Sequence, residues 1–220
     1  MTLFENRIEA GKQLVKHLLQ YQDNKNVLVL TLPRGGVPVG FQVAKTLRVP
    51  LDIFLVRKLG VPFQEELAMG AIASGGITVF NEDILRMIHI SPHVIEDVKA
   101  QELAVLKRRE ALYRGNRTPP MIKDKIIILI DDGIATGATM RAAITALKKL
   151  ECKKIVVATP VAPPDTCEQL RREVDEIVCL EMPYPFYAIG GWYQDFSQTS
   201  DEEVQDLLIQ AENFGKPEGA

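Results

Sequence analysis

The apolar residues of the chain fall into short runs that alternate with segments of helical spacing. Each run is rich in Val, Ile and Leu without polar alternation, which is typical of strands buried on both faces of a parallel sheet. The segments between them have the spacing of crossover helices. This order predicts an α/β fold with a doubly wound, mainly parallel sheet and right-handed crossovers. The predicted strands are residues 27–32, 51–56, 126–130, 155–159 and 176–180, and the crossover helices are residues 37–47, 138–150 and 165–174.

Two further helices are predicted outside this alternation. Residues 5–21 carry apolar side chains at near-helical spacing and predict an amphipathic helix. Ser91 followed by Pro92 is a typical helix start, and a charged segment with an apolar residue at every seventh position continues from it to Gly115. The sequence shows no internal repeat, and none of its Pro- or Gly-bearing stretches indicates a domain boundary.

The composition supports a single domain and argues against several classes of protein. A chain of 220 residues with 46% hydrophobic content fits one domain with a sizeable core. The net charge of -3 argues against a surface built to bind nucleic acid or anionic lipid. No apolar run approaches the ~18 residues of a membrane span, and the N-terminal segment is unlike a signal peptide, so we expect a cytoplasmic protein. The cysteines are odd in number and far apart, which favours reduced thiols over disulfides or zinc ligands.

The loop after the predicted strand 126–130 combines carboxylates with small residues. Asp131 and Asp132 follow the strand directly, and a run of small residues leads into the next helix. In an open α/β sheet, ligands bind beyond the carboxyl ends of the strands, where a helix N-terminus offers backbone N–H groups to a phosphate. The carboxylates can accept hydrogen bonds from two ribose hydroxyls or hold magnesium through water, and Thr136 and Thr139 can donate to the phosphate. The alternative is that the aspartates end a strand and Thr136 caps a helix.

Two more loops follow predicted strands and carry cations. Arg34 lies beside Gly35 and Gly36, so its guanidinium can bind a phosphate in a bidentate manner while the glycines expose backbone amides. Arg57 and Lys58 repeat this arrangement after the next strand and precede a polar stretch, residues 61–68, that we expect to be a loop. The alternatives are an ordinary turn at the first loop and solvated charges at the second.

Aromatic residues gather in residues 183–197, a segment with little regular periodicity. Because the segment follows the last predicted strand, it can fold back over the carboxyl ends of the sheet. Phe186, Tyr187 or Trp192 would then stack on a planar acceptor base and form one wall of its pocket. The alternative is a small aromatic satellite core beneath a C-terminal helix.

Residues 128–140 read Ile-Leu-Ile-Asp-Asp-Gly-Ile-Ala-Thr-Gly-Ala-Thr-Met and closely resemble the phosphoribosyl pyrophosphate signature of the type I phosphoribosyltransferases. The two cationic loops resemble that family's pyrophosphate loop and the base of its mobile catalytic loop. The resemblance implies the type I fold with a small hood that selects the acceptor. It covers residues 27–160, and the expected single domain of residues 1–220 has its core at about residues 27–182 and its hood at residues 1–26 and 183–220.

The resemblance also assigns roles to the site residues. Asp131 and Asp132 are expected to bind the ribose hydroxyls, with Mg²⁺ held near them by the ligand and water. Related pyrophosphate loops often contain a non-proline cis peptide bond, which we expect between Pro33 and Arg34. The catalytic cations are expected to be Arg34, Arg57 and Lys58, and the other residues expected to bind phosphoribosyl pyrophosphate are Pro33, Gly35, Gly36, Ala135, Thr136, Gly137, Ala138 and Thr139.

As the resemblance implies, the protein is a pentosyltransferase of nucleotide metabolism. A ring nitrogen of a small acceptor would attack C1 of phosphoribosyl pyrophosphate as pyrophosphate leaves, while closure of residues 60–70 excludes water. Ala135 and the Arg57-Lys58 pair are similar to adenine-type enzymes, whereas residues 33–36 are similar to the xanthine-type loop, so the acceptor stays open. The overall likeness is to stand-alone bacterial phosphoribosyltransferases without an assigned base, which share the ending at residues 191–196. The oligomeric state is open, with a homodimer among the options.

Two other classes of function compete with this interpretation. A regulator could keep the phosphoribosyl pyrophosphate site, bind RNA or a protein, and do little chemistry, although the acidic pI argues against RNA. A hydrolase acting on a phosphorylated sugar would need a group that activates water. His17, His89 and His93 lie in predicted helical segments away from the three loops, which argues against the hydrolase.

Overall fold

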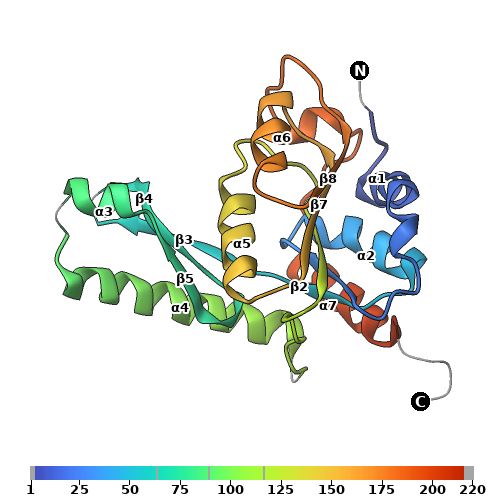
Figure 1. Ribbon diagram of the computed structural model, residues 1–220. Coiled ribbons are helices and arrows are strands. Elements are labelled where there is room, and N and C mark those ends of the chain that lie inside the picture. Colours follow the sequence, from blue (N-terminus) through green and yellow to red (C-terminus); the bar gives the residue numbers. More distant parts are fainter. Residues whose placement is uncertain (1–2, 63, 89, 116, 216–220) are drawn as a thin grey trace.

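The body of the molecule is a five-stranded parallel sheet in the order β2-β1-β6-β7-β8 (Figure 1). The computed structural model describes residues 3–62, 64–88, 90–115 and 117–215, and for Glu65 and Glu66 it describes the backbone only. The sheet confirms the predicted α/β class. Its strands are β1 Val27–Thr31, β2 Leu51–Ile53, β6 Ile126–Ile130, β7 Lys154–Val161 and β8 Glu176–Glu181.

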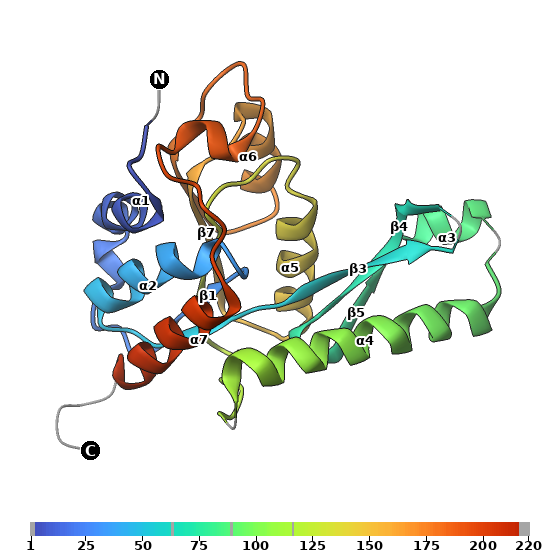
Figure 2. The same ribbon diagram turned by 180° about the vertical axis from the view of Figure 1, so that it is seen from behind.

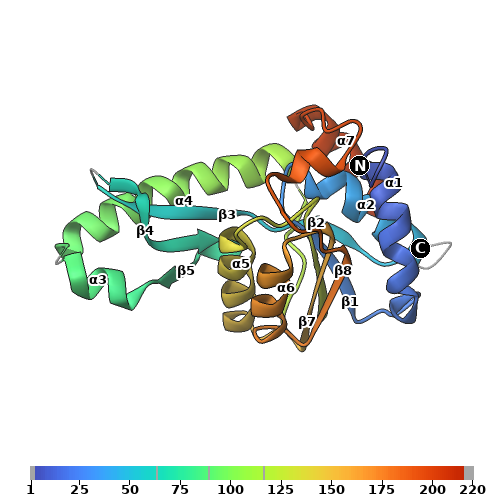
Figure 3. The same cartoon turned by 90° about the horizontal axis from the view of Figure 1, so that it is seen from above.

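Helices cover both faces of this sheet (Figure 3). On one face lie α1 Arg7–Leu14 and α2 Gly36–Leu47, with α7 Asp201–Gln210 packed against α2. On the other face lie α5 Ala138–Lys149 and α6 Pro164–Arg171. The helix predicted over residues 5–21 is α1 followed by two short 3₁₀ turns, Val15–His17 and Leu19–Tyr21.

The central strands are apolar throughout because each of their faces is buried in a different core. In β6, Ile128 and Ile130 join the core on the α2 side, whereas Ile127 and Leu129 join the core on the α5 side. All four side chains are fully buried. This arrangement explains why the sequence of these strands shows continuous runs and no alternation of apolar with polar residues.

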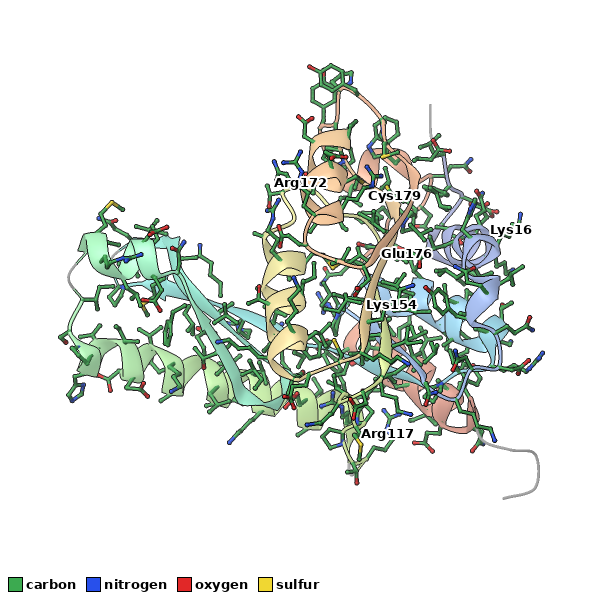
Figure 4. All side chains as sticks on the ribbon, viewed as in Figure 1. Lys16, Arg117, Lys154, Arg172, Glu176 and Cys179 are labelled. Atoms are coloured by element: carbon green, nitrogen blue, oxygen red, sulfur yellow. The ribbon has the colours of Figure 1, made fainter. Side chains whose placement is uncertain are left out.

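Polar contacts join neighbouring strands at the end of the sheet opposite to the candidate site. Lys154 and Glu176 begin β7 and β8, and their side chains pair at 2.8 Å (Figure 4). Tyr21 donates to the same carboxylate at 2.5 Å. The pairing attaches the second 3₁₀ turn to the sheet and leaves the carboxyl ends of the strands to the loops.

A second, antiparallel sheet forms an arm that projects from the body (Figures 1 and 2). It has the order β3-β4-β5, with β3 Val56–Val61, β4 Gln64–Ala73 and β5 Ile77–Phe80. Two helices follow, α3 Glu82–Ile88 and α4 Pro92–Arg114, and α4 runs back along β3 to the body. The short 3₁₀ segments elsewhere are Ser74–Gly76, Ile189–Trp192 and Ala211–Asn213.

The arm corrects two predictions from the sequence. The strand predicted over residues 51–56 ends at Ile53, and Val56 already belongs to the arm. The predicted loop over residues 61–68 is wrong, because most of it pairs in the β3–β4 hairpin. The polar residues of this stretch lie at the start of β4, and the apolar residues of that strand come later. The β3–β4 pairing also shifts register on both sides of Gly60. The hairpin therefore shows no clean period-2 pattern in the sequence.

The long helix α4 confirms the predicted ends and is anchored to the body by a buried ion pair. Ser91 caps its first turn, and Gly115 ends it with φ of 57°. Arg114 Nε lies 3.0 Å from Asp52 Oδ1 on β2, and Arg114 Nη2 donates to the Ile53 carbonyl at 2.9 Å. Both side chains are nearly buried, so each charge depends on the other for its solvation. None of the helices in the described ranges has the length and apolar character needed to span a membrane.

We predict that Arg114→Ala lowers the free energy of unfolding by about 3–5 kcal/mol, because it leaves Asp52 buried without a counter-charge. Urea denaturation would measure the loss. The control is Arg86→Ala, which removes an ion pair to Asp83 whose side chains are 75% and 91% exposed and should cost less than about 1 kcal/mol. Equal losses in the two variants would contradict the anchoring role.

Candidate functional site

The loop after β1 and the loop after β6 are in direct contact at the carboxyl ends of adjacent strands. A Cβ atom on Gly35 would lie 1.9 Å from Asp132 Oδ2, and one on Gly36 would lie 2.9 Å from the Ile130 carbonyl oxygen. Both glycines are therefore required by close approach. The Pro33-Arg34 peptide is cis, which confirms the expectation for this loop. The structure thus brings together the acidic pair and the glycines of the expected pyrophosphate loop.

Asp132 is held by an arginine that the sequence analysis did not select. Arg7 Nε lies 2.7 Å from Asp132 Oδ2, and the two side chains are only 11% and 10% exposed. Arg7 Nη1 also donates to the Ser197 carbonyl at 2.7 Å, and its guanidinium lies 3.9 Å from the centre of the Phe196 ring. Arg7 occurs on a helix with several other charged residues, and no motif distinguishes it from them.

The two adjacent carboxylates therefore have different surroundings. Burial raises the pKa of Asp131 well above its usual range, and the neighbouring Asp132 charge raises it further. Burial also raises the pKa of Asp132, but there the Arg7 charge and hydrogen bond oppose the shift. Asp131 Oδ1 accepts from the Asp132 backbone N–H at 2.9 Å. Of the pair, Asp131 is the carboxylate without a cation bound directly to it in the described part of the chain.

The N-terminal and C-terminal segments meet over this acidic pair. The backbone N–H of Phe4 donates to the Trp192 carbonyl at 3.0 Å, and the N–H of Gln194 donates to the Phe4 carbonyl at 2.9 Å. Tyr193, which is buried, donates its hydroxyl to the Asp132 carbonyl at 2.5 Å. These contacts place parts of the two segments expected to form the hood beside the expected ribose site.

The expected phosphate loop has its carbonyls fixed by side chains of the neighbouring helices. Thr166 on α6 donates to the Ala135 carbonyl at 2.8 Å, and Arg141 on α5 donates to the Thr136 carbonyl at 3.0 Å. Because a trans peptide directs its N–H opposite to its C=O, the N–H groups of Thr136 and Gly137 must face away from these partners. Within the described residues no acceptor binds those two N–H groups. Unpaired N–H groups of this kind at the start of a helix can bind an anion.

Arg141 is itself held in place from α6 and the turn that follows it. Its Nε lies 3.1 Å from Glu173 Oε1, and its Nη2 donates to Gln169. Gly137, with φ of 76°, makes the turn into α5, and a Cβ there would lie 3.1 Å from the Thr166 methyl group. Neither Thr166 nor Arg141 belongs to the motif that resembles the family signature, and only the packing of α6 beside the loop reveals them.

The expected catalytic cations include Arg34 and Arg57, whose side chains pair with carboxylates on other elements. Arg34 Nη1 lies 3.5 Å from Asp201 Oδ1 at the start of α7. Arg57 Nε lies 2.7 Å from Glu102 Oε2 on α4. Lys58, the next residue of β3, lines a cavity of about 310 Å³ between the arm and α5 that also reaches Ala138 and Thr139.

The aromatic residues expected to form an acceptor wall are divided between a small core and the surface. Phe186 and Trp192 stack with ring centroids 6.2 Å apart and pack against a satellite cluster around Phe4 and Tyr193. Tyr187 is 88% exposed. Phe186 and Trp192 therefore pack in a small aromatic core, but its described members include no residue of α7, so it is not the core beneath a C-terminal helix that the sequence left as an alternative. Acceptor stacking by any of the three stays a prediction.

The histidines contribute no water-activating group to the described site. His17 ends a 3₁₀ turn after α1, and His93 lies on α4, where Nδ1 is 2.9 Å from Asp97 on an exposed surface. His89 lies outside the described residues. These positions agree with the sequence argument against hydrolysis of a phosphorylated sugar.

Comparisons with known proteins agree with the geometry of the loops. A family model described as "Phosphoribosyl transferase domain" matches residues 3–190. The chain is 45% identical over 211 residues to the "Putative phosphoribosyl transferase" of Mycobacterium tuberculosis, in strains CDC 1551 / Oshkosh and H37Rv. That match covers 96% of this chain and 47% of the relative, so the chain spans about half the length of the curated relatives it matches. The crystal structure of TT1426 from Thermus thermophilus is 37% identical and superposes with a TM-score of 0.84, covering 95% of this chain and 99% of that one.

We predict that Asp132→Asn lowers the free energy of unfolding by about 3 kcal/mol, because the buried Arg7 loses its counter-charge. The matched control is Asp23→Asn, whose carboxylate pairs with Arg48 at an exposed site and should cost less than about 1 kcal/mol. Urea denaturation of both variants provides the measurement, and an unchanged midpoint for Asp132→Asn would contradict the prediction.

We also predict that Thr166→Val weakens the binding of ribose 5-phosphate roughly tenfold, whereas Thr166→Ser stays within about twofold of the wild type. Valine has nearly the same shape but leaves the Ala135 carbonyl without its donor, so the loop amides lose their orientation. Calorimetric titration measures the affinities. Thr145→Val is the matched control, because Thr145 also donates to a backbone carbonyl, that of Arg141, but within α5. Similar affinities for the Val and Ser variants at residue 166 would refute the orienting role.

Proposed function

The chain belongs to the phosphoribosyl transferase family, and from this premise we propose that it transfers the phosphoribosyl group of phosphoribosyl pyrophosphate to a nitrogen of a nucleobase-like acceptor, releasing pyrophosphate. The fold is that of the type I enzymes. The observation that carries the proposal is the contact between Gly35 and Asp132. The contact places a pyrophosphate-type loop beside an acidic pair, and a phosphate-type loop follows that pair in the chain. A ribose that carries a 5-phosphate and a pyrophosphate on C1 presents its groups in the same order.

Each part of such a substrate has a counterpart among the described residues. The N–H groups of Thr136 and Gly137 would bind the 5-phosphate at the start of α5, where the helix dipole adds to the attraction. Asp131 would accept hydrogen bonds from the ribose hydroxyls, with Asp132 held beside it by Arg7. The amides of Gly35 and Gly36 would bind the pyrophosphate together with Arg34 and Arg57.

The reaction is a substitution at C1 of the ribose. The bond from C1 to the pyrophosphate oxygen breaks as a bond from the acceptor nitrogen to C1 forms, and the nitrogen then loses its proton. Positive charge develops on the sugar and negative charge on the leaving group. The proposed role of Arg34, Arg57 and Lys58 is to stabilise the departing pyrophosphate, because cations aimed at a developing anion act strongly in a site that excludes water.

The donor set fits a magnesium ion that is held mainly by its substrate. No cluster of three or more acidic, histidine or cysteine ligands is found among the residues that the structure describes. Mg²⁺ commonly uses one or two carboxylates together with substrate phosphates and water. Asp131, with Asp132 beside it, supplies that number of carboxylates, and the ion would neutralise charge on the pyrophosphate.

The acceptor is the part of the proposal that depends most on the hood. Ile189 lies against the acidic loop, because a Cβ on Gly133 would come within 2.3 Å of its side chain. The segment of Phe186, Tyr187 and Trp192 therefore adjoins the expected ribose site, which supports the proposal that this segment selects a planar base. We propose no particular base. A panel of purine and pyrimidine bases, assayed for pyrophosphate release, would distinguish a transferase from a regulator that only binds phosphoribosyl pyrophosphate.

We predict that Asp131→Asn weakens the binding of phosphoribosyl pyrophosphate about 100-fold in the presence of Mg²⁺, because the variant loses charge-assisted hydrogen bonds to two ribose hydroxyls. Its unfolding free energy should stay close to that of the wild type, since the Arg7 ion pair is kept. Calorimetry with and without a chelator measures the affinity and its dependence on magnesium. Wild-type protein that fails to bind phosphoribosyl pyrophosphate with Mg²⁺ would overturn the proposed function.

A further inference from the structure

Four side chains of α4 form a stripe that faces the pyrophosphate side of the site. Glu102, Leu106, Arg109 and Tyr113 follow one another at intervals of four, three and four residues, which places them on one face of the helix. By helical spacing this stripe adjoins the apolar positions at every seventh residue that the sequence analysis noted. Helix α4 runs beside β3, so this stripe lies along the strand that carries Arg57 (Figure 2).

Three members of the stripe already have defined contacts at the site. Glu102 accepts from Arg57 Nε at 2.7 Å. Leu106 is fully buried and forms part of a cavity wall. Tyr113 donates to Asp201 at 2.6 Å, and Asp201 in turn pairs with Arg34. The burial of Tyr113 and this hydrogen bond raise its pKa to about 12, so it remains a neutral donor at physiological pH.

Arg109, the fourth member, lines the same small cavity. The cavity has a volume of about 40 Å³ and is bounded by the pyrophosphate loop, the start of β3, α4 and the start of α5. Its polar lining includes Arg57, Arg109 and Thr139, and Pro33 closes the side of the pyrophosphate loop. A cavity of this size holds more than one water-sized group. Among the described residues, none forms a hydrogen bond or an ion pair with Arg109.

The charge balance around this cavity indicates what it binds. Arg34 is matched by Asp201 and Arg57 by Glu102, so these two pairs contribute little net charge. Arg109 adds a positive charge with no carboxylate against it in the described part of the chain. An arginine fork that faces a cavity beside a glycine-rich loop matches the geometry of a phosphoryl group.

We propose that Arg109 is a further pyrophosphate-binding cation, contributed by the arm helix, and that it contacts the diphosphate and not the 5-phosphate. The inference rests on the proposed function and deepens it. Arg57 and Pro33 border the cavity on the pyrophosphate side, and Thr139 is its one contact with the phosphate loop. Helix α4 thereby supplies the partner of Arg57, the donor that holds Asp201, and a direct ligand of the leaving group.

The test uses inorganic pyrophosphate and ribose 5-phosphate as separate probes of the full chain with Mg²⁺. We expect Arg109→Gln to weaken pyrophosphate binding about tenfold or more, because one charge-assisted contact is lost, and to leave ribose 5-phosphate binding within about twofold. Arg108→Gln is the matched control, because Arg108 is the adjacent exposed arginine of α4 and lies outside the stripe. It should bind both probes as the wild type does.

The outcomes separate this inference from the proposed function. If Arg109→Gln and Arg108→Gln bind pyrophosphate equally well while the wild type binds both probes, the role of Arg109 is refuted and the proposed function stands. If Arg109→Gln loses ribose 5-phosphate binding instead, the assignment to the diphosphate is refuted. If the wild type binds neither probe, both proposals fail. Because Arg109 is exposed, the melting temperature of the variant should match that of the control.

Discussion

The ion pair between Arg7 and Asp132 is the constraint on which the rest of the candidate site depends. A buried carboxylate next to a second carboxylate is unstable unless a cation compensates for the lost hydration. Here the cation comes from α1, 125 residues earlier in the chain, and it also contacts Ser197 and Phe196 near the other end. One guanidinium thus ties two remote segments, α1 and the segment of Phe196 and Ser197, to the loop after β6. The segments expected to form the hood are held over the sheet, because the buried Asp132 carboxylate needs the Arg7 guanidinium as its counter-charge.

This pairing gives two adjacent aspartates separate tasks. Asp132 serves the structure through its carboxylate, its carbonyl and its contact with Gly35, whereas Asp131 keeps a carboxylate without a cation bound directly to it in the described part of the chain. A similar division applies to the phosphate loop, where the N–H groups would bind the ligand and the carbonyls bind Thr166 and Arg141. In both places the ligand-binding geometry is set by groups that would not touch the ligand. The motif supplies the binding atoms, and the neighbouring helices orient them.

The arm brings charged side chains to the candidate site. Its hairpin carries Arg57, and α4 returns to the body, where Arg114 buries its charge against Asp52. That anchor fixes the rotation of the last turns of α4, and therefore the direction in which Tyr113 and Arg109 point. On the pyrophosphate side, Arg34 and Arg57 are each matched by a carboxylate of another element.

The sequence by itself determined the features that depend on local periodicity and on contiguous motifs. The parallel strands, the crossover helices, the ends of α4 and the loops after β1 and β6 all follow from residues close together in the chain, whereas the loop expected at Arg57 and Lys58 is part of strand β3. Strand β4 was missed, because the polar hairpin that it forms with β3 has a shifted register and no clean period. Strand β5, Ile77–Phe80, was missed as well, and it pairs with β4 without a shift. The tertiary structure alone decided the roles of Arg7, Thr166 and Arg141. Each of these acts through a partner on another element, and an isolated Arg or Thr on a helix has the same local pattern whether it faces solvent or a buried carboxylate. Only the packing of the helices on the sheet determines which of these it faces.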